Sequence, residues 1–334
     1  MNSPIKFSLI VPVFNRPDEA RELLQSLTAQ TYADFEVIIV EDGSQQTCEK
    51  EVALYQEKLN IKYFSKANEG PGLTRNFGAQ RASGNYFIFF DSDCLIPQAY
   101  MQIVKNALET NWLDVFGGPD AAHPSFTPIQ KAISYSMTSF FTTGGIRGGE
   151  KKVDVFHPRS FNMGFSREVF ERTGGFAKMR FGEDLDMSMR IIEAGYKAGL
   201  IREAFVYHKR RTDFRKFFKQ VHNSGIARIN LYKRHPQTLK LVHFAPAIFV
   251  IFLALAILAA LAGFWSGIIM LLIYFVIIFI DSWRKNSDVN VALFSVQSAF
   301  VQHMGYGTGF IKAFWQRIVL GKPEFHAYEK NFYK

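Results

Sequence analysis

The chain has 334 residues, 48% of them hydrophobic and 21% charged, a composition that excludes a disordered or fibrous protein. Its formal charge is +9, and residues 209–240, with ten lysines and arginines and one acid, carry that whole excess. Because the remainder is neutral, no nucleic-acid partner is expected. The two cysteines suit a reducing compartment, and the first 16 residues lack the layout of a signal peptide. The amino-terminal part is therefore predicted to be cytosolic.

Apolar strands and amphipathic helices alternate over the first two hundred residues. Strands are predicted at 7–13, 35–40, 61–64 and 86–90, and helices at 17–30, 49–59 and 72–81. Strands that are apolar on both faces and alternate with helices indicate an α/β fold, with a mostly parallel sheet and helices on both faces. In such sheets the ligand binds at the carboxyl ends of the strands.

Polar residues follow these predicted strands. Asn15 and Arg16 follow the first, Asp42 the second, and Asp91 and Asp93 the fourth. Two carboxylates at a strand end suit Mg²⁺ or Mn²⁺, which takes further ligands from substrate phosphates. Asp42 could accept a hydrogen bond from a base or a ribose. Ordinary aspartate turns are the alternative interpretation at both places.

Two further segments carry candidate site residues. Arg75 and Asn76 lie at a predicted helix start, where N–H groups and a cation would meet phosphate, unless the arginine is an ordinary surface residue. Glu183 and Asp184 open an amphipathic helix, and a carboxylate there can accept a hydroxyl proton. Asp186 is the competing candidate, and dipole partners are the alternative for these acids.

Residues 241–280 contain no charged residue and are long enough for two membrane crossings. Gly263, Ser266 and Gly267 supply the turn, so 241–281 is predicted to be a transmembrane helical hairpin; a re-entrant hairpin and a buried soluble hairpin are the alternatives. The basic residues on both flanks place both ends on the cytoplasmic side. We therefore expect a multi-pass protein of the cytoplasmic (inner) membrane with its catalytic part in the cytosol.

The flanking segments are predicted to lie on the membrane surface. Residues 209–240 combine a basic and an apolar helix face, as interfacial helices on anionic lipid do, with a solvated charge run as the alternative. Residues 289–319 are apolar but carry polar side chains and three glycines, and we interpret them as an interfacial or partly inserted helix pair. The segment 282–334 then ends in a basic cytosolic tail.

Six motifs in this order resemble family 2 glycosyltransferases of the A-type nucleotide-sugar fold. They are VPVFNR, EDGS, NEGPGLTRNFG, GNYFIFFDSDC, FNMGFSREVFERTGGF and GEDLDMSMRIIEAGY. The resemblance covers about residues 5–208, so 1–208 is the expected catalytic domain. It implies a nucleotide-sugar pocket lined by Pro12, Phe14, Asn15, Arg16, Asp42, Arg75, Asn76 and Asp91. It also implies Asp93 as direct metal ligand together with Asp91, a further ligand in His208, and Asp184 as catalytic base. The sugar and acceptor pockets are assigned to Gly118, Asn162, Met163 and Glu183.

The resulting prediction is a Mg²⁺- or Mn²⁺-dependent inverting hexosyltransferase. It would move one sugar from a nucleoside-diphosphate sugar, with a UDP-sugar favoured, to a hydroxyl of a polyprenyl-diphosphate-linked saccharide in surface polysaccharide biosynthesis. A polyprenyl-phosphate sugar synthase is one alternative. A processive polysaccharide synthase is another, although the Gln-x-x-Arg-Trp motif of such enzymes is absent after Gln220. A non-catalytic nucleotide-sugar-binding membrane scaffold is the alternative from a different class.

Overall fold

The computed structural model describes residues 4–121, 123–144, 157–179 and 181–324, which form two compact units. The first comprises residues 4–121 and 157–208, and the second comprises 123–144 and 209–324. Residues 123–144, expected within the catalytic domain, group with the C-terminal helices. The physical reason is apolar packing, because Ile133 and Met137 share a buried cluster with Phe217 and Val221.

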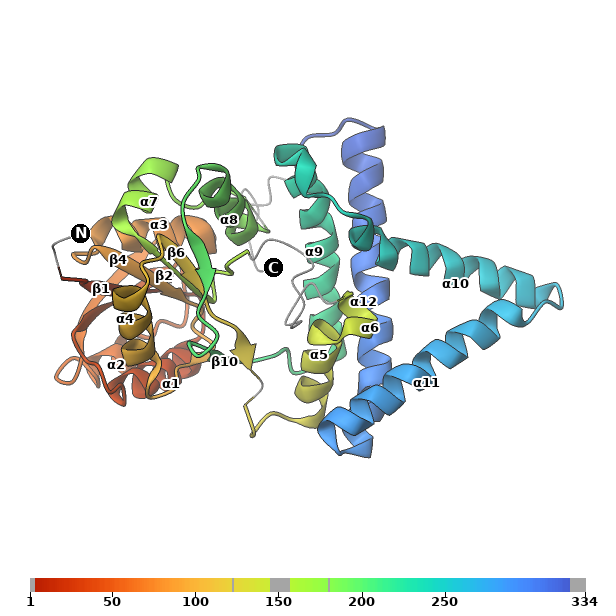
Figure 1. Ribbon diagram of the computed structural model, residues 1–334, viewed down its shortest axis with the longest axis horizontal. Coiled ribbons are helices and arrows are strands. Elements are labelled where there is room, and N and C mark those ends of the chain that lie inside the picture. The colour runs from red at the N-terminus through yellow and green to blue at the C-terminus, as the bar shows by residue number, and fades with distance from the viewer. Residues whose placement is uncertain (1–3, 122, 145–156, 180, 325–334) are drawn as a thin grey trace. The chain divides into compact units, whose positions relative to one another are not determined.

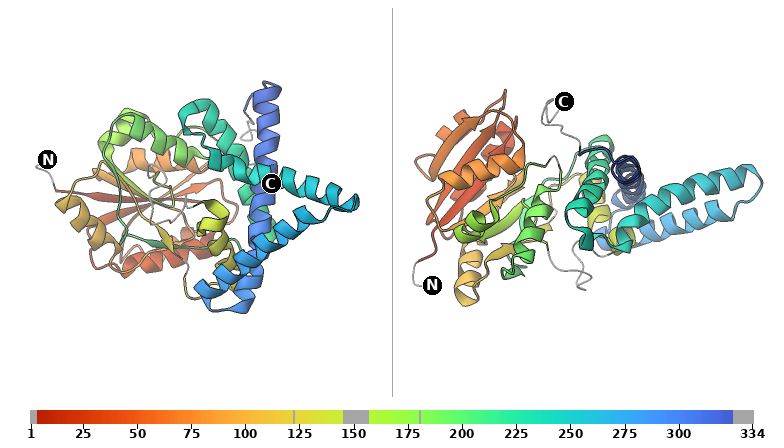
Figure 2. Two further views of the ribbon diagram at one scale, coloured as in Figure 1. Left: turned by 45° about the vertical axis from the view of Figure 1, so that its right-hand side comes forward. Right: turned by 90° about the horizontal axis from the view of Figure 1, so that it is seen from above.

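A seven-stranded sheet forms the first unit (Figures 1 and 2). Its order is β3-β2-β1-β4-β8-β6-β9; the first four strands are parallel, and β8 is antiparallel to both of its neighbours. A smaller sheet pairs β10 with β5 and β7. The strands are β1 (Phe7–Val13), β2 (Phe35–Asp42), β3 (Asn60–Lys66), β4 (Tyr86–Phe90), β5 (Cys94–Leu95), β6 (Val115–Gly117), β7 (Asp120–Ala121), β8 (Asn162–Ser166), β9 (Ala198–Leu200) and β10 (Val206–His208).

Helices cover both faces of this sheet, which confirms the predicted fold class. Alternate residues of β1 enter different cores: Leu9 and Val11 pack with residues of α1 and α4, and Ile10 packs with residues of α3, α7 and α8. These helices are α1 (Pro17–Thr28), α3 (Pro71–Arg81), α4 (Tyr100–Thr110), α7 (Arg167–Thr173) and α8 (Glu183–Glu193). The helix predicted at 49–59 is shorter, because α2 (Glu49–Ala53) gives way to turns.

The second unit is helical. Its helices are α5 (Pro128–Thr138), α6 (Phe140–Thr143), α9 (Phe214–Arg234), α10 (Ala245–Leu261), α11 (Ser266–Asn286) and α12 (Val289–Phe314). Leu241–Leu261 and Ser266–Asn286 are long and apolar enough to cross a membrane. Figure 1 shows α10 and α11 as a hairpin whose open end meets α12. Most of its side chains are not buried by the protein, as a lipid-facing hairpin requires.

The helices that flank the hairpin pack against each other. The apolar side of α9 contacts α12 and α5, with Phe217 and Val221 both buried. The position of α9 on a membrane surface stays a prediction. The helix pair predicted at 289–319 is wrong, because residues 289–314 form one continuous helix. The glycines of α12 do not break it but permit close packing, because a Cβ on Gly309 would lie 2.1 Å from the His222 carbonyl oxygen of α9. A Cβ on Gly225 of α9 would in turn lie 2.2 Å from the Tyr306 carbonyl oxygen. Small residues at such a crossing let two helix backbones touch.

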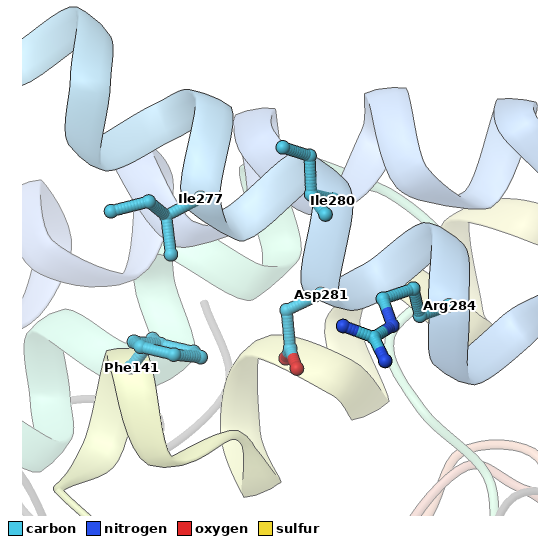
Figure 3. A pocket seen from close by; sticks show the side chains of 5 residues that line it. All are labelled: Phe141, Ile277, Ile280, Asp281 and Arg284. Atoms are coloured by element: carbon cyan, nitrogen blue, oxygen red, sulfur yellow. The ribbon is translucent and has the colours of Figure 1, made fainter.

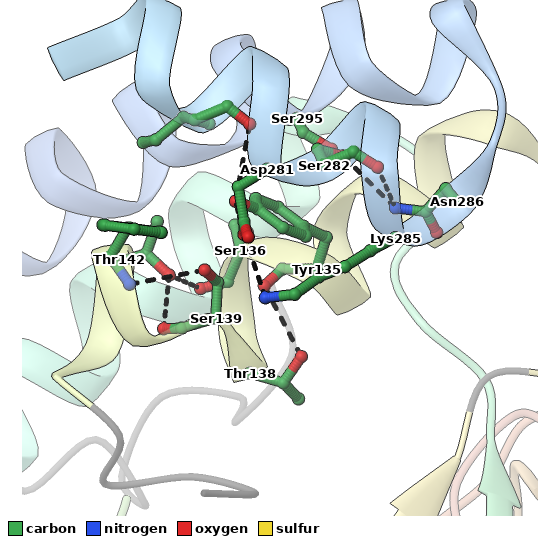
Figure 4. A network of polar contacts seen from close by, with 12 residues as sticks. Tyr135, Ser136, Thr138, Ser139, Thr142, Asp281, Ser282, Lys285, Asn286 and Ser295 are labelled. Carbon is green, nitrogen blue, oxygen red and sulfur yellow. Dashed lines mark hydrogen bonds and ion pairs between the residues drawn. The ribbon is translucent and has the colours of Figure 1, made fainter.

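Polar contacts tie α5 and α6 to α11. The Tyr135 hydroxyl donates to Asp281 Oδ2 at 2.6 Å, and Lys285 Nζ lies 2.9 Å from the same oxygen (Figure 4). Beside this network lies a groove of about 240 Å³ lined by Phe141, Ile277, Ile280, Asp281 and Arg284 (Figure 3). Its walls are apolar, and its charged residues come from the carboxyl-terminal end of α11.

Candidate active site

The carboxylates after β4 meet the end of β10 and the start of α1. Arg16 Nη1 lies 2.5 Å from Asp93 Oδ2, and His208 Nε2 lies 3.1 Å from Asp93 Oδ1 and 3.9 Å from Asp91 Oδ2. The Phe161 ring stacks on the His208 imidazole, with the ring centroids 4.9 Å apart. Four residues singled out in the sequence analysis are thus gathered in one place, although more than a hundred residues separate His208 from the other three.

This group contains the donor atoms that a divalent cation requires. Ligand atoms of Asp93, Cys94 and His208 lie within 4.8 Å of one another. Burial raises the pKa of the Cys94 thiol well above its ordinary value, and the sulfur lies 3.6 Å from the Phe161 carbonyl oxygen as a donor. A sulfur ligand suits softer metals, whereas Mg²⁺ and Mn²⁺ prefer oxygen ligands. The remaining ligands are the Asp93 carboxylate and the His208 imidazole. This pair fits Mn²⁺ or Mg²⁺ if substrate oxygens supply the other ligands.

Arg75 is buried and holds two of the candidate acids together. Its guanidinium lies 2.6 Å from Asp91 Oδ1 and 3.1 Å from Glu183 Oε1, and its side chain is only 3% exposed. Contact of Arg75 and Asn76 with the nucleotide stays a prediction, and the structure shows a further role for each. Asn76 exchanges two hydrogen bonds of 2.8 Å with the backbone of Phe176, so it fixes the loop that precedes α8. Glu183 and Phe176 lie about a hundred residues away from Arg75 and Asn76 in sequence, which is why sequence spacing does not reveal these two contacts.

Glu183 and Asp184 occupy the first turn of α8 and are both buried. Asp184 Oδ2 accepts from Arg159 Nε at 2.7 Å, and Oδ1 accepts from the backbone N–H of Leu185 at 2.8 Å. Burial by itself would raise the pKa of Asp184, but the Arg159 guanidinium outweighs it and the pKa is lowered. Burial and the charge of Asp184 raise the pKa of Glu183. The pKa values of these two adjacent carboxyl groups are therefore shifted in opposite directions, and Asp184 is held as the carboxylate.

Arg159 was not identified from the sequence, since no motif marks an ion pair across 25 residues. The competing candidate, Asp186, is 2% exposed and pairs with Arg190 four residues later at 2.8 Å. Arg190 also donates to the backbone carbonyls of Thr173 and Gly175. Asp186 thus holds Arg190 in the position from which it binds the loop after α7. Because Asp186 is engaged in this way, Asp184 is the better candidate for a base.

Asp42 and Asn15 hold the loops that follow β2 and β1. Both carboxylate oxygens of Asp42 accept backbone hydrogen bonds of 2.9 Å, from Glu69 and Gly70. Asn15 has a positive φ of 51°, and its Oδ1 accepts from the backbone N–H of Gln45 at 2.7 Å. The two side chains therefore shape the loops at this edge of the sheet. Contact with a nucleotide stays a prediction for them, as it does for the half-buried Pro12 and Phe14.

The residues expected in the sugar and acceptor pocket lie on or beside two central strands, Asn162 and Met163 on β8 and Gly118 after β6. Met163 is fully buried in the hydrophobic core beneath the sheet. Asn162 is also fully buried, accepting from the Tyr100 hydroxyl at 2.5 Å and donating to the Ala204 carbonyl at 2.8 Å. The backbone N–H of Gly118 donates to the Asn162 carbonyl at 3.1 Å. Asn162 and Met163 point to opposite faces of β8, and both faces are covered, so neither side chain reaches solvent. A role of these residues in a sugar or acceptor pocket stays a prediction.

Comparisons with known proteins bear on the family and the fold. An uncharacterised glycosyltransferase of Rickettsia conorii is 40% identical over 106 residues, which cover 32% of this chain and only 18% of that relative. Glycosyltransferase AglE of Haloferax volcanii is 26% identical over 259 residues, covering 75% of this chain and 82% of the relative. The solved mannosyltransferase PcManGT of Pyrobaculum calidifontis, in complex with GDP-Man and Mn²⁺, superimposes with a TM-score of 0.65. That similarity covers 95% of this chain and 89% of the other at 18% identity, so it shows the fold alone. Residues 8–174 match the family described as glycosyl transferase family 2, and the chain belongs to that family.

Proposed function

We propose that this protein transfers one sugar, with inversion, from a nucleoside-diphosphate sugar to a hydroxyl of a lipid-linked saccharide. The observation that carries the proposal is the gathering of acids in the first unit. Asp93 contacts His208, Asp91 joins Glu183 through Arg75, and Asp184 follows Glu183 in the same helical turn. Arg75, through its two ion pairs, thus links the proposed diphosphate site at Asp91 to the helical turn that carries the proposed base.

Asp184 is the proposed base. Its lowered pKa keeps it deprotonated at neutral pH, so it can accept the proton of the attacking hydroxyl. Arg159 holds one of its oxygens at 2.7 Å, and this contact must loosen or rotate as the acceptor binds. Since a single displacement needs one base and no covalent nucleophile, inversion follows.

Asp93 and His208, with Asp91 through its nearby oxygen, would hold a Mn²⁺ or Mg²⁺ ion. Such an ion neutralises charge on a departing diphosphate. The PcManGT complex, which contains GDP-Man and Mn²⁺ on the same fold, supports this assignment. We propose that the donor is a nucleoside-diphosphate sugar of this general kind and that UDP-sugars should be tested first.

The second unit supports a lipid-borne acceptor at the cytoplasmic membrane. Two helices have the length and apolar composition of membrane spans, and the basic residues that flank them favour a cytosolic catalytic unit. The groove between α6 and α11 combines apolar walls with a cation, Arg284, which has no ion-pair or hydrogen-bond partner among the described residues. An acyl or polyprenyl chain ending in phosphate has the complementary chemistry. Attachment to the same membrane raises the effective concentration of such an acceptor.

The test is sugar transfer by the full chain in proteoliposomes containing a polyprenyl-diphosphate-linked saccharide. UDP- and GDP-sugars with a radiolabelled sugar are supplied with Mn²⁺, and lipid products are separated by chromatography. Asp184→Asn should lower kcat by about 10²–10⁴-fold, since it removes the base. Asp18→Asn, at a side chain that is 79% exposed, is the matched control and should leave kcat unchanged.

Equal activity of Asp184→Asn and the wild type would refute the mechanism. A product with the sugar directly on the lipid phosphate would instead identify a polyprenyl-phosphate sugar synthase, and long polymers would identify a processive enzyme. Thermal unfolding with different nucleoside diphosphates and Mn²⁺ identifies the nucleobase of the sugar donor. A ligand that binds only the folded state raises the unfolding temperature.

A further inference from the structure

Arg16 lies on the carboxylate that would hold the metal. Its Nη1 is 2.5 Å from Asp93 Oδ2, while the other oxygen of Asp93 lies 3.1 Å from His208. The contact is set by the fold, because Arg16 is the residue before α1 and follows β1, and Asp93 follows the neighbouring strand β4. The Asp93 side chain is only 10% exposed, so water screens this pair weakly.

We infer that Arg16 is a built-in counter-cation that occupies Asp93 until a divalent cation and the donor diphosphate bind together. The inference rests on the metal site proposed above. A carboxylate oxygen engaged by a guanidinium offers less electron density to a metal, and a guanidinium beside a divalent ion is repelled by it. The free protein should therefore bind the metal weakly.

The sugar donor reduces the repulsion between the metal ion and Arg16, because the negative charge of its diphosphate attracts both. A guanidinium forms strong charge-assisted hydrogen bonds with phosphate oxygens, so Arg16 can exchange Asp93 for the donor. Its side chain is 34% exposed, whereas that of Arg75 is 3% exposed, so Arg16 is the arginine of the two with room to move. Arg16 thus couples metal binding to donor binding. This role differs from that of a permanent ion pair that only holds the loops after β1 and β4 together.

The experiment measures Mn²⁺ binding by the full chain in detergent, using electron paramagnetic resonance, with and without UDP as the probe. We compare the wild type with Arg16→Gln and with Arg21→Gln as the matched control. Arg21 lies on the same helix and pairs with Asp18 at 3.3 Å through two exposed side chains, so its loss changes the net charge equally without contacting Asp93. A third variant, Arg16→Lys, keeps the cation.

Arg16→Gln should bind Mn²⁺ at least tenfold more tightly than the wild type without UDP, and added UDP should then tighten Mn²⁺ binding less than it does in the wild type. Arg21→Gln and Arg16→Lys should behave as the wild type. The inference is overturned if Arg16→Gln binds Mn²⁺ no more tightly than the wild type, if Arg21→Gln gains equally, or if no form binds Mn²⁺. Sugar transfer that persists in a chelator would count against the proposed metal dependence itself, which separates the two failures.

Discussion

Replacing Arg75 by methionine removes the cation between Asp91 and Glu183 while keeping an unbranched side chain. Breaking a buried ion pair by deleting one partner costs about 3–5 kcal/mol, because the other partner remains as an uncompensated charge. The Glu183 side chain is 11% exposed, but that of Asp91 is 32% exposed and keeps some water. We therefore expect a loss near the lower limit, about 3 kcal/mol. For a unit of this size the midpoint of thermal unfolding should fall by roughly 6–12 °C.

The loss of stability should depend on pH. The pKa of Glu183 is raised in the folded protein, so its contribution to stability is fully present below the unfolded-state pKa and is lost as pH rises through the folded-state pKa. Without Arg75 this pKa should rise further, because the substitution removes a guanidinium whose charge stabilises the Glu183 carboxylate. The destabilisation should therefore be larger at about pH 7.5 than at about pH 5.

The assay is thermal unfolding of the full chain in detergent, followed by circular dichroism. Arg172→Met is the matched control, because Arg172 pairs with Glu168 at 3.5 Å through side chains that are 72% and 61% exposed. The double variant Arg75→Met with Glu183→Gln should recover part of the loss, since it removes the stranded charge. The reasoning is refuted if Arg75→Met unfolds at the wild-type temperature, or if its loss is the same at both pH values.

Three further predictions concern the base, the helical unit and the metal. Arg159→Gln should move the acid limb of the pH profile of kcat/KM to higher pH, because it removes the guanidinium that lowers the pKa of Asp184; an unmoved limb would exclude Asp184 as the group observed. Gly309→Val should destabilise the helical unit by about 1–3 kcal/mol in thermal unfolding, as its side chain meets the His222 carbonyl, whereas Leu293→Val at an exposed position of α12 should cost little. A chelator should abolish sugar transfer and Mn²⁺ or Mg²⁺ should restore it; full activity in the chelator would contradict the proposed ligands.

Local signals explain why the fold could be predicted from the sequence. Strands that are apolar on both faces require covering helices, and the polar residues after them must lie at one edge of the sheet. Arg16 after β1 and Asp93 after β4 therefore lie in contact. His208 belongs to the smaller sheet, and its place beside Asp93 follows from the family resemblance and not from this strand pattern. The two membrane-length helices follow in the same way from an uninterrupted apolar run.

Long-range pairing explains what could not be predicted. Nothing near Arg75 in the sequence indicates that its partner is Glu183, and Arg159 lies outside every motif quoted above. Burial is a second limit, since Asn162 and Met163 point to opposite faces of β8 and are both fully buried, which alternation along the sequence does not reveal. The glycines of α12 show a third: the same residue type that ends a helix in water permits close helix packing elsewhere.

The contact between α9 and α12 limits how these two helices can move. Where Gly225 and Gly309 lie, each backbone approaches a carbonyl of the other helix too closely for even a methyl group. Sliding one helix along the other would bring larger side chains into this crossing, so the pair is expected to shift as one rigid body. Any rearrangement of the helical unit would therefore have to come from its other connections.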